Sequence, residues 1–326
     1  MSNLETTPKE FACVSTDAAE LEVLSPREVP LGGVRALPVR RTLPQHQRSL
    51  IGAWCFADHY GPQDLRRSAG MDVPPHPHTG LQTVSWLFRG QIEHRDSAGV
   101  HQLVNPGELN LMTAGAGICH SEVSTPETTI LHGVQLWVAL PDAHRNTARD
   151  FDHYVPEPFS QGNAEIRVFL GELAGQRSPV HTFTPLLGAQ LDLAAGCTVD
   201  LDVDPGFEHG VLLDLGRVDV AGRTLDSGQL AYLGPGCTTV ALHNPAGMAA
   251  RVVLLGGAPF TEELLMWWNF VGRSHDEIVS FRQLWQDGDD RFGAVNGYTG
   301  SVPRLPAPAL PATRLRPRRK TLKEFR

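Results

Sequence analysis

Short apolar runs separated by turn residues dominate the hydrophobic pattern of the chain. Examples are TVSWLF, HGVQLWVAL, IRVFLGEL, GVLLDLG and ARVVLLGG, and 32 Gly and 25 Pro are spread through the sequence between such runs. Short runs rich in β-branched residues, with turn signals close together, are typical of antiparallel sandwiches and barrels. The pattern therefore predicts an all-β protein.

Helical periodicity is expected only late in the chain, between residues 261 and 287. The segment TEELLMWWNFVG is followed by SHDEIVSFRQLW, in which Ser274 and Glu277 have the spacing of a capping box. One face of the second segment is apolar and is formed by Ile278, Phe281 and Trp285. We expect one or two short helices here, packed against the β body.

An internal repeat divides the chain into two similar parts. Residues 89–117 and 215–238 share one order: a Gly, an alternating segment, a Gly-containing turn, Pro-Gly or Ser-Gly, and an apolar strand. A length of 326 residues suits two domains. The predicted organisation is a loose tail over 1–20, a first domain over 21–150, a linker over 151–165, a second domain over 166–260, helices over 261–290, and a proline-rich then basic tail over 291–326.

The charge of the chain is acidic. The formal net charge is −8, and residues 312–326 hold seven of the 28 Lys and Arg but one of the 36 Asp and Glu, which leaves 21 against 35, or −14, elsewhere. Phosphate contacts need a basic surface, so direct nucleic-acid binding is not expected.

Targeting signals and cysteine usage favour a cytoplasmic protein. No run of 18 apolar residues exists, and the N-terminus MSNLETTPKEFACVS has neither a basic flank nor an apolar segment, so no membrane association is expected. The five cysteines form no C-x-x-C pair. Their odd number and wide spacing favour reduced thiols over a disulfide framework.

Two pairs of metal-type side chains occur at strand spacing. His76 and His78 are two residues apart, and His120 and Glu122 repeat that spacing after the glycines of TAGAG. Residues two apart on a strand project from one face, about 6.5–7 Å from each other. On neighbouring strands the pairs would offer three imidazoles and one carboxylate, a set that suits Fe(II), Mn, Ni, Cu or Zn. The alternative is surface decoration, because a single H-x-H occurs by chance in a chain with 14 histidines.

The second repeat lacks these residues. Counted back from Gly90 and Gly216, His76 and His78 fall opposite Asp202 and Asp204. The predicted metal site therefore belongs to the first domain alone. Candidates to orient the ligating rings are Gln82, Asp58, His59 and His132.

Four segments resemble the pirin family of the cupin superfamily. They are DHYGP (58–62), PPHPHTGLQTVSWLFRGQIEHRDSAG (74–99), NPGELNLMTAGAGICHSE (105–122) and HGVQLWVALP (132–141). The resemblance implies a bicupin, two antiparallel jelly-roll β-barrels face to face, with a mononuclear metal in the N-terminal barrel held by residues matching His76, His78, His120 and Glu122. Many pirins have Glu at the position of Gln82, which is expected to line the site. An amide at that position cannot serve as a general base.

The resemblance also implies a choice of functions. Some pirins resemble quercetin 2,3-dioxygenases, which would make this chain an enzyme acting on a flavonol-like aromatic molecule and O2 with one divalent transition metal, Fe(II) being the ion expected and Mn, Ni, Cu or Zn the alternatives. The alternative is a non-catalytic regulatory protein whose metal or redox state controls a protein partner. A third option is a structural bicupin that keeps a vestigial ion.

Overall fold

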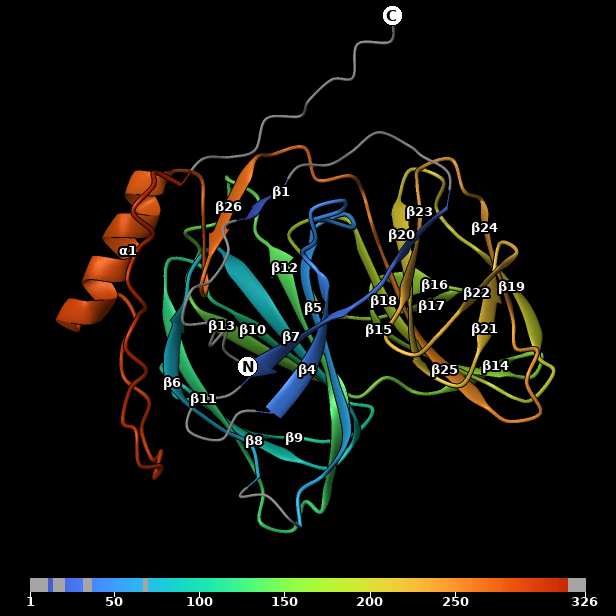
Figure 1. Ribbon diagram of the computed structural model, residues 1–326, viewed down its shortest axis with the longest axis horizontal. Helices are drawn as coiled ribbons and strands as arrows, with labels where there is room; N and C mark the ends of the chain where they lie inside the picture. The colour runs from blue at the N-terminus through green and yellow to red at the C-terminus, as the bar shows by residue number, and fades with distance from the viewer. Residues whose placement is uncertain (1–10, 14–20, 32–36, 67–69, 316–326) are drawn as a thin grey trace, which may run out of the picture.

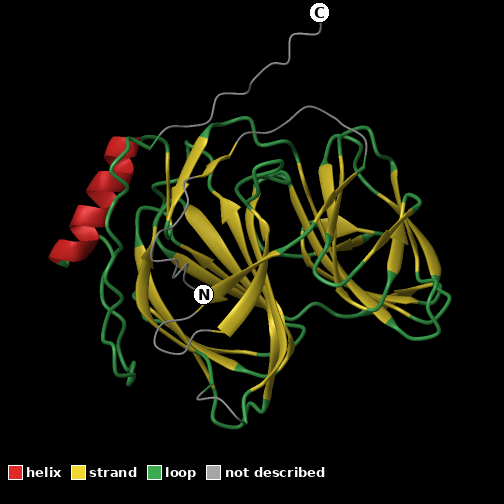
Figure 2. Ribbon diagram, viewed as in Figure 1, coloured by secondary structure: helices red, strands yellow, loops and turns green. Residues whose placement is uncertain are grey.

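The computed structural model describes residues 11–13, 21–31, 37–66 and 70–315, and nearly all of its regular structure is strand (Figures 1 and 2). The all-β class is therefore confirmed. Most of the tail predicted over 1–20, and the basic end from 316 onward, lie outside the described residues. No helix within the described ranges has the length and apolar character needed to cross a membrane.

The first domain consists of two antiparallel sheets. The larger sheet has the strand order β13 (Asp150–Tyr154), β10 (Leu109–Thr113), β7 (Leu81–Arg89), β12 (Ile130–Ala139), β5 (Trp54–Asp64), β4 (Leu37–Leu43) and β3 (Arg27–Leu31). The smaller sheet has the order β6 (Asp72–His78), β11 (Ile118–Ser124), β8 (Ile92–Asp96) and β9 (His101–Val104).

The second domain repeats this plan. Its larger sheet has the order β14 (Phe159–Gln161), β15 (Ala164–Leu170), β18 (Leu186–Leu193), β25 (Ala250–Gly257), β20 (Glu208–Leu215), β23 (Leu230–Leu233) and β2 (Glu22–Leu24). Its smaller sheet has the order β19 (Thr198–Asp202), β24 (Thr239–His243), β21 (Val218–Val220) and β22 (Arg223–Leu225). The hairpin of β16 (Glu172–Leu173) and β17 (Gln176–Arg177) adds to this domain.

The internal repeat seen in the sequence is thus a repeat of topology. Strands β5 to β12 and strands β18 to β25 occupy the same places in their sheets, one for one and in the same chain order. Between β5 and β12, and between β18 and β25, every connection passes from one sheet to the other except the β8–β9 and β21–β22 hairpins of the smaller sheets, an arrangement typical of a jelly roll. The two sheets of a domain remain separate ladders, so each domain is an open jelly roll and not a closed barrel.

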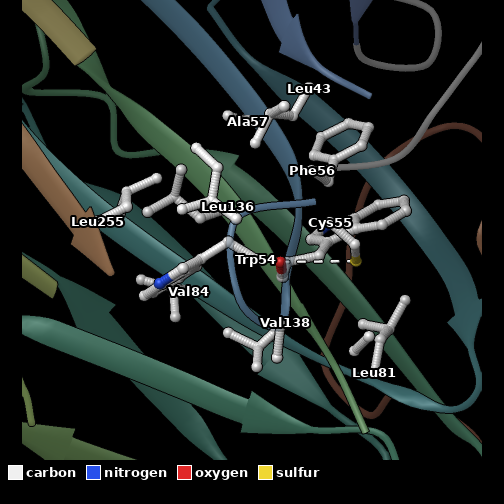
Figure 3. Packing of buried hydrophobic residues seen from close by; sticks show 14 of the residues in the cluster. Leu43, Trp54, Cys55, Phe56, Ala57, Leu81, Val84, Leu136, Val138 and Leu255 are labelled. Carbon is white, nitrogen blue, oxygen red and sulfur yellow. Dashed lines mark hydrogen bonds between the residues drawn. The ribbon is translucent and has the colours of Figure 1, made fainter. Parts of the chain in front are cut away.

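The larger sheets of the two domains pack face to face. Trp54 lies in the shared core with Val84, Leu136 and Val138 of the first domain and Leu255 of the second (Figure 3). The Trp54 indole Nε1 donates to the carbonyl oxygens of Leu187 and Gly256 in the second domain, both at 3.1 Å. A tryptophan buries about 150–250 Å², so residues of this type dominate the packing energy of such an interface.

Both ends of the chain cross between the domains. Strand β2, which the sequence prediction includes in the first domain, pairs with β23 of the second. At the other end, β26 (Leu264–Trp267) and β27 (Phe270–Gly272) form a sheet with β1 (Phe11–Cys13) and lie against the first domain (Figure 1). The predicted linker over 151–165 contains β13 at its start and β14 further on, one strand for each domain.

The structure has one of the one or two helices expected between residues 261 and 287, and the segment TEELLMWWNFVG is not helical. That segment forms the β26–β27 hairpin, in which Trp267 pairs with Phe270 across a two-residue turn and Trp268 has a φ of 54°. A short run that is apolar on all sides does not distinguish a strand from a buried helix. The turn at Trp268 and Asn269 decides for the hairpin, since positive φ suits the tight turns of hairpins.

The second predicted helix is confirmed as α1 (His275–Asp287). Ser274 is its N-cap, and its hydroxyl accepts from the Glu277 N–H at 3.2 Å. Gly288 ends the helix with a φ of 76°, a conformation that favours glycine. The buried residues are Ile278, Phe281 and Trp285, the face that the periodicity indicates.

Candidate metal centre

The two predicted ligand pairs lie on adjacent antiparallel strands. His76 and His78 end β6, His120 and Glu122 lie on β11, and the Cα partner of His76 is His120. A bulge between His120 and Glu122 shifts the register of this strand pair. The ring centroids of His76 and His120 are 4.3 Å apart. All four side chains are completely buried.

Hydrogen bonds to the outer ring nitrogens orient two of the imidazoles. His76 Nδ1 lies 2.8 Å from the carbonyl oxygen of Pro74, and His78 Nδ1 lies 3.2 Å from that of Asn269. A carbonyl oxygen only accepts, so each Nδ1 carries the proton and each Nε2 carries a lone pair. The Asn269 contact comes from the turn between β26 and β27, so the C-terminal hairpin helps to set the His78 ring.

A chain of polar side chains orients the third imidazole. His120 Nδ1 lies 3.4 Å from Nδ1 of His94, and His94 Nε2 lies 3.1 Å from Oδ2 of Asp96. Asp96 accepts, so His94 Nε2 is the donor there and His94 Nδ1 is left as the acceptor for the His120 Nδ1–H. Nε2 of His120 therefore also carries a lone pair.

Three lone pairs therefore converge in one buried space. Nε2 of His78 and Nε2 of His120 are only 3.1 Å apart, and the buried Nε2 of His76 has no hydrogen-bond partner. Burial lowers the pKa of His76 to about 3 and lowers the pKa values of His78 and His120 well below their usual range. Neutral rings whose acceptor atoms face each other repel unless a cation lies among them, so the arrangement fits a metal ion.

The carboxylate of Glu122 completes the set. Its Oε1 accepts from the Ser85 hydroxyl at 3.0 Å, and Ser85 Oγ also lies 3.0 Å from Oε1 of Gln135. Ser85 has one proton, and Nε2 of Gln135 is buried without a partner. Exchanging the amide nitrogen and oxygen of Gln135 satisfies both groups, because the amide then donates to Ser85 while Ser85 donates to Glu122.

His94 is a site residue that the sequence prediction missed. It is buried, and one of its ring nitrogens lies within 4.8 Å of ligand atoms of His120 and Glu122. His94 and Asp96 are two residues apart on β8, the same-face spacing that singled out the other pairs. That spacing in the segment IEHRDS was the signal available.

Gln82 does not lie at the site, contrary to the sequence prediction. Side chains alternate along the uninterrupted pairing of β7 with β10, so Gln82 and Ser85 point to opposite faces. Ser85 reaches Glu122, whereas Gln82 Nε2 donates to Thr113 Oγ1 at 2.9 Å on the face toward the second domain. The turn at Thr79 and Gly80 resets the alternation between His78 and Gln82, which a fixed four-residue spacing ignores.

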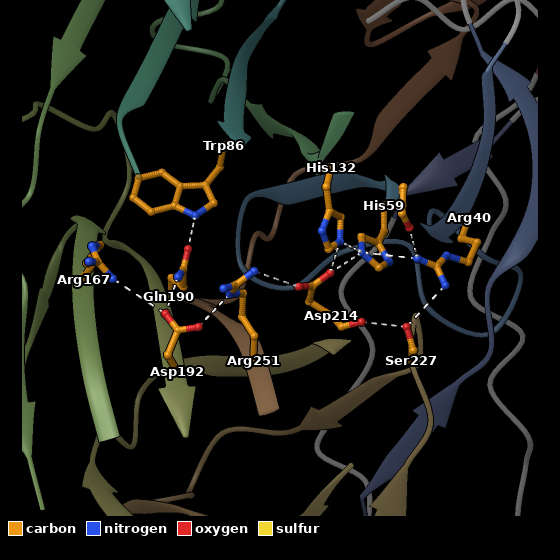
Figure 4. A network of polar contacts seen from close by, with 11 residues as sticks. Arg40, His59, Trp86, His132, Arg167, Gln190, Asp192, Asp214, Ser227 and Arg251 are labelled. Carbon is orange, nitrogen blue, oxygen red and sulfur yellow. Dashed lines mark hydrogen bonds and ion pairs between the residues drawn. The ribbon is translucent and has the colours of Figure 1, made fainter. Parts of the chain in front are cut away.

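Asp58, His59 and His132 also have other roles than the predicted orientation of ligand rings. Asp58 accepts a bidentate pair of hydrogen bonds from Arg41, both at 2.7 Å. His59 and His132 place their Nε2 atoms 2.6 and 2.5 Å from Oδ1 of Asp214 in the second domain (Figure 4). We call these three residues the interdomain triad.

The interdomain triad has the residue types of a second metal site, but its surroundings are cationic. The Arg40 guanidinium lies 3.4 Å from His59 Nε2, and that of Arg251 lies 3.4 Å from Oδ2 of Asp214 (Figure 4). Two guanidinium charges beside one carboxylate disfavour a further dication. The triad is accounted for by two imidazole N–H groups donating to one carboxylate oxygen.

The second domain has no counterpart of the His/Glu cluster. Among the described residues, the groups of His, Cys, Asp and Glu close enough to hold an ion lie in the first domain or at the domain interface. Glu208, opposite Gln82 in the repeat, faces the first domain and accepts from the Gly52 N–H at 2.7 Å.

Comparison with known proteins agrees with this architecture. Residues 36–138 match the pirin domain and residues 188–293 match the pirin C-terminal cupin domain. A protein of Pseudomonas aeruginosa named "Putative quercetin 2,3-dioxygenase" is 44% identical over 292 residues, which are 89% of this chain and 91% of that protein.

Solved structures give the same result. A crystal structure of quercetin 2,3-dioxygenase from Acinetobacter baumannii superposes with a TM-score of 0.85 at 38% identity, covering 90% of this chain and 96% of that one. The nickel(II) complex of the bacterial pirin YhhW from Escherichia coli shares the fold, with a TM-score of 0.56 at 16% identity over 74% of this chain and 99% of that one. By domain matches, sequence identity and fold, this chain belongs to the pirin family of cupin proteins.

Proposed function

We propose that this protein is a metal-dependent dioxygenase of the quercetin 2,3-dioxygenase type. In this proposal His76, His78, His120 and Glu122 hold one divalent transition metal, with Fe(II) the ion we expect, and the substrates are a flavonol and O2. The observation that carries the proposal is the convergence of three imidazole lone pairs and one carboxylate in the first jelly roll. The names of the similar proteins from Pseudomonas and Acinetobacter supply the substrate class.

In this proposal the bound ion, the groups that orient the imidazoles and the carboxylate have separate roles. The bound ion supplies Lewis acidity toward a flavonol oxygen and one-electron chemistry toward O2. Pro74, Asn269 and His94 hold the three rings with their Nε2 atoms inward. Glu122, which accepts a hydrogen bond from Ser85, is the carboxylate that takes the proton of the flavonol hydroxyl. Gln82 cannot have this role, because an amide is not a general base and because its side chain points away from the site.

The test is an assay of the protein loaded separately with Fe(II), Mn(II) and Ni(II) and incubated with quercetin under oxygen. Loss of flavonol absorbance together with release of carbon monoxide is the expected result for at least one ion. His76→Ala and Glu122→Ala should abolish both, whereas His101→Ala, an exposed histidine of β9, should not. No bleaching and no carbon monoxide with all three ions would contradict the proposal.

The complete burial of the four ligand side chains favours a second candidate, a metal- or redox-dependent regulatory protein. A buried ion can change the stability of the covering segments without meeting a substrate. Binding of a protein partner that depends on the oxidation state of the iron would support this function. Identical partner binding by His120→Ala would count against it.

A further inference from the structure

A cavity of about 710 Å³ opens in the second domain, away from the His/Glu cluster. Its walls come from the β16–β17 hairpin, from residues 178–187, and from the loop between β19 and β20. The volume lies within the range of small-molecule sites, about 300–1,000 Å³.

The internal repeat relates the position of this cavity to that of the His/Glu cluster in the first domain. The β19–β20 connection corresponds to the β6–β7 connection, which follows His76 and His78 directly in the first domain. There the β26–β27 hairpin lies against the connection, with the Val271 N–H donating to the Thr79 carbonyl at 3.1 Å. The cavity thus lies at the end of the second jelly roll that corresponds to the metal-ligand end of the first.

His209 is a buried polar group beside this cavity. Its relative exposure is 0%, and neither of its ring nitrogens has a hydrogen-bond partner. On β20 it alternates with Glu208 and Gly210, which contact the first domain, so His209 points into the interior of the second jelly roll. Its ring lies 6.2 Å from that of Phe207, centroid to centroid, and Phe207 lines the cavity.

The buried imidazole of His209 has a donor and an acceptor that a ligand could satisfy by hydrogen bonding. Burial lowers the pKa of His209 to about 4, so the ring is neutral near pH 7 and offers one N–H donor and one acceptor. A buried donor or acceptor without a hydrogen-bond partner destabilises the folded protein. Phe207 is half-buried and lines the cavity, and its ring lies beside the imidazole, so a ligand that reaches His209 from the cavity must displace the Phe207 ring.

The charged side chains that line the cavity determine which ligand charge it favours. The carboxylates of Glu172, Asp202 and Asp204 line the cavity together with the guanidinium of Arg177. Arg177 is already paired with Glu172, Nη2 to Oε2, at 2.7 Å. The two aspartates therefore leave the cavity negative, which favours a cation over an anion.

We propose that this cavity binds a small organic ammonium compound. The ammonium group donates to the Asp204 carboxylate and to the acceptor nitrogen of His209, and the apolar or aromatic body packs against Phe207 and Leu187, both of which line the cavity. A protonated amine satisfies both groups at once, since it has three N–H donors and a positive charge. The site is independent of the metal cluster and gives the second domain a function of its own.

Calorimetric titration of the full-length protein with three probes of matched size tests this proposal. The probes are phenethylamine, 2-phenylethanol and 3-phenylpropionate, which differ in carrying a cation, a neutral hydroxyl or an anion. We expect the amine to bind at least ten times more tightly than the other two. Equal binding of all three probes, or no binding of the amine, would overturn the proposal.

Two variants locate the binding. Asp204→Asn keeps the acceptor for the Gly206 N–H, now at 2.7 Å, but removes the charge, and His209→Leu removes the imidazole. Each should weaken amine binding at least tenfold, while Asp226→Asn, an exposed aspartate of the same domain, should leave it unchanged. Unfolding temperature and metal content, measured on the same samples, show whether a variant is folded. Wild-type amine affinity in folded Asp204→Asn would also overturn the proposal.

Discussion

At the scale of single residues, the direction of hydrogen bonds decides what the candidate metal centre can hold. His76 and His78 donate through Nδ1 to carbonyl oxygens, and His120 donates to a histidine that itself donates to a carboxylate. Each ring thus presents Nε2 to the same space. His94, which the sequence prediction did not include, contacts Nδ1 of His120, and its contribution to metal binding can be tested.

Replacing His94 by leucine should weaken metal binding about 10- to 100-fold, the usual effect of removing a group that orients a ligand. The reason is that Nδ1–H of His120 loses its acceptor, so the ring no longer has a fixed orientation. His94→Asn retains an acceptor near that nitrogen and should lose less. Competition with a chromophoric chelator measures the affinity, and His101→Leu on the neighbouring strand is the matched control. Unchanged affinity in His94→Leu would show that the contact is not needed.

Gln82→Glu should destabilise the protein and leave metal binding intact. The new carboxylate would lie in the apolar interface between the domains, where burying a charge without a cationic partner is costly, and we expect a loss of about 2–3 kcal/mol. Urea unfolding measures the change in the free energy of unfolding, with the exposed Gln176→Glu as the control. A gain in dioxygenase activity without a loss of stability would place residue 82 at the site after all.

At the scale of elements, the C-terminal hairpin and helix cover the end of the first domain that contains the His/Glu cluster. The β26–β27 turn supplies the carbonyl that holds His78, and Phe270 of β27 has its ring centroid 5.9 Å from that of Phe281 of α1. Trp285 of α1 donates from its indole N–H to the Leu305 carbonyl at 2.8 Å, which ties the following segment to the helix. The stability of α1 is therefore linked to the geometry of the site.

Ser274→Ala should destabilise α1 by about 1 kcal/mol, because the N-cap hydroxyl that accepts from the Glu277 N–H is lost. Ser274→Asp keeps an acceptor and adds a negative charge at the helix N-terminus, so it should be neutral or slightly stabilising. Urea unfolding followed by tryptophan fluorescence reports both changes. Equal destabilisation by alanine and aspartate would mean that the cap does not account for the effect.

At the scale of the whole molecule, buried polar groups join the two jelly rolls. The interdomain triad is the clearest case, since His59 and His132 of the first domain donate to Asp214 of the second (Figure 4). Trp86 adds a hydrogen bond from its indole N–H to Oε1 of Gln190, at 2.8 Å. Such contacts specify how the two apolar faces meet, because any other docking would leave these groups unpaired.

Asp214→Asn should cost about 3–5 kcal/mol, the usual effect of breaking a buried charged group out of its pair. An amide still accepts a hydrogen bond but no longer balances Arg251, whose Nη1 lies 3.4 Å from Asp214 Oδ2. Guanidinium unfolding gives the free energy, and Asp226→Asn serves as the surface control. A change below about 1 kcal/mol would mean that water replaces the lost interactions.

The metal-free protein should lose stability as the pH falls below about 6.5, the value for an unfolded histidine. Burial lowers the pKa of His59, and it lowers that of His209 to about 4. Below pH 6.5 the unfolded chain therefore binds more protons than the folded protein. Proton binding stabilises the unfolded state, so the free energy of unfolding falls as the pH falls. The hydrogen bonds from His132 and His59 hold the pKa of Asp214 below its usual range against the effect of burial, so a further loss begins near pH 4. Unfolding temperatures recorded from pH 7.5 to about 3.5 test both losses, and a flat profile would contradict them.

The sequence by itself determined the features that depend on local spacing. Alternating apolar runs specify strands, the Ser274 cap and apolar face specify α1, and the H-x-H and H-x-E spacings place each pair of candidate ligands on one strand. Tertiary structure decided what depends on distant contacts. The alternation of β7 after the Gly80 turn points Gln82 away from the site, the Trp268 turn makes a hairpin of a predicted helix, and His94 joins His120 only because β8 pairs with β11. Spacing along a chain does not encode which strands become neighbours or which face of a sheet another domain covers.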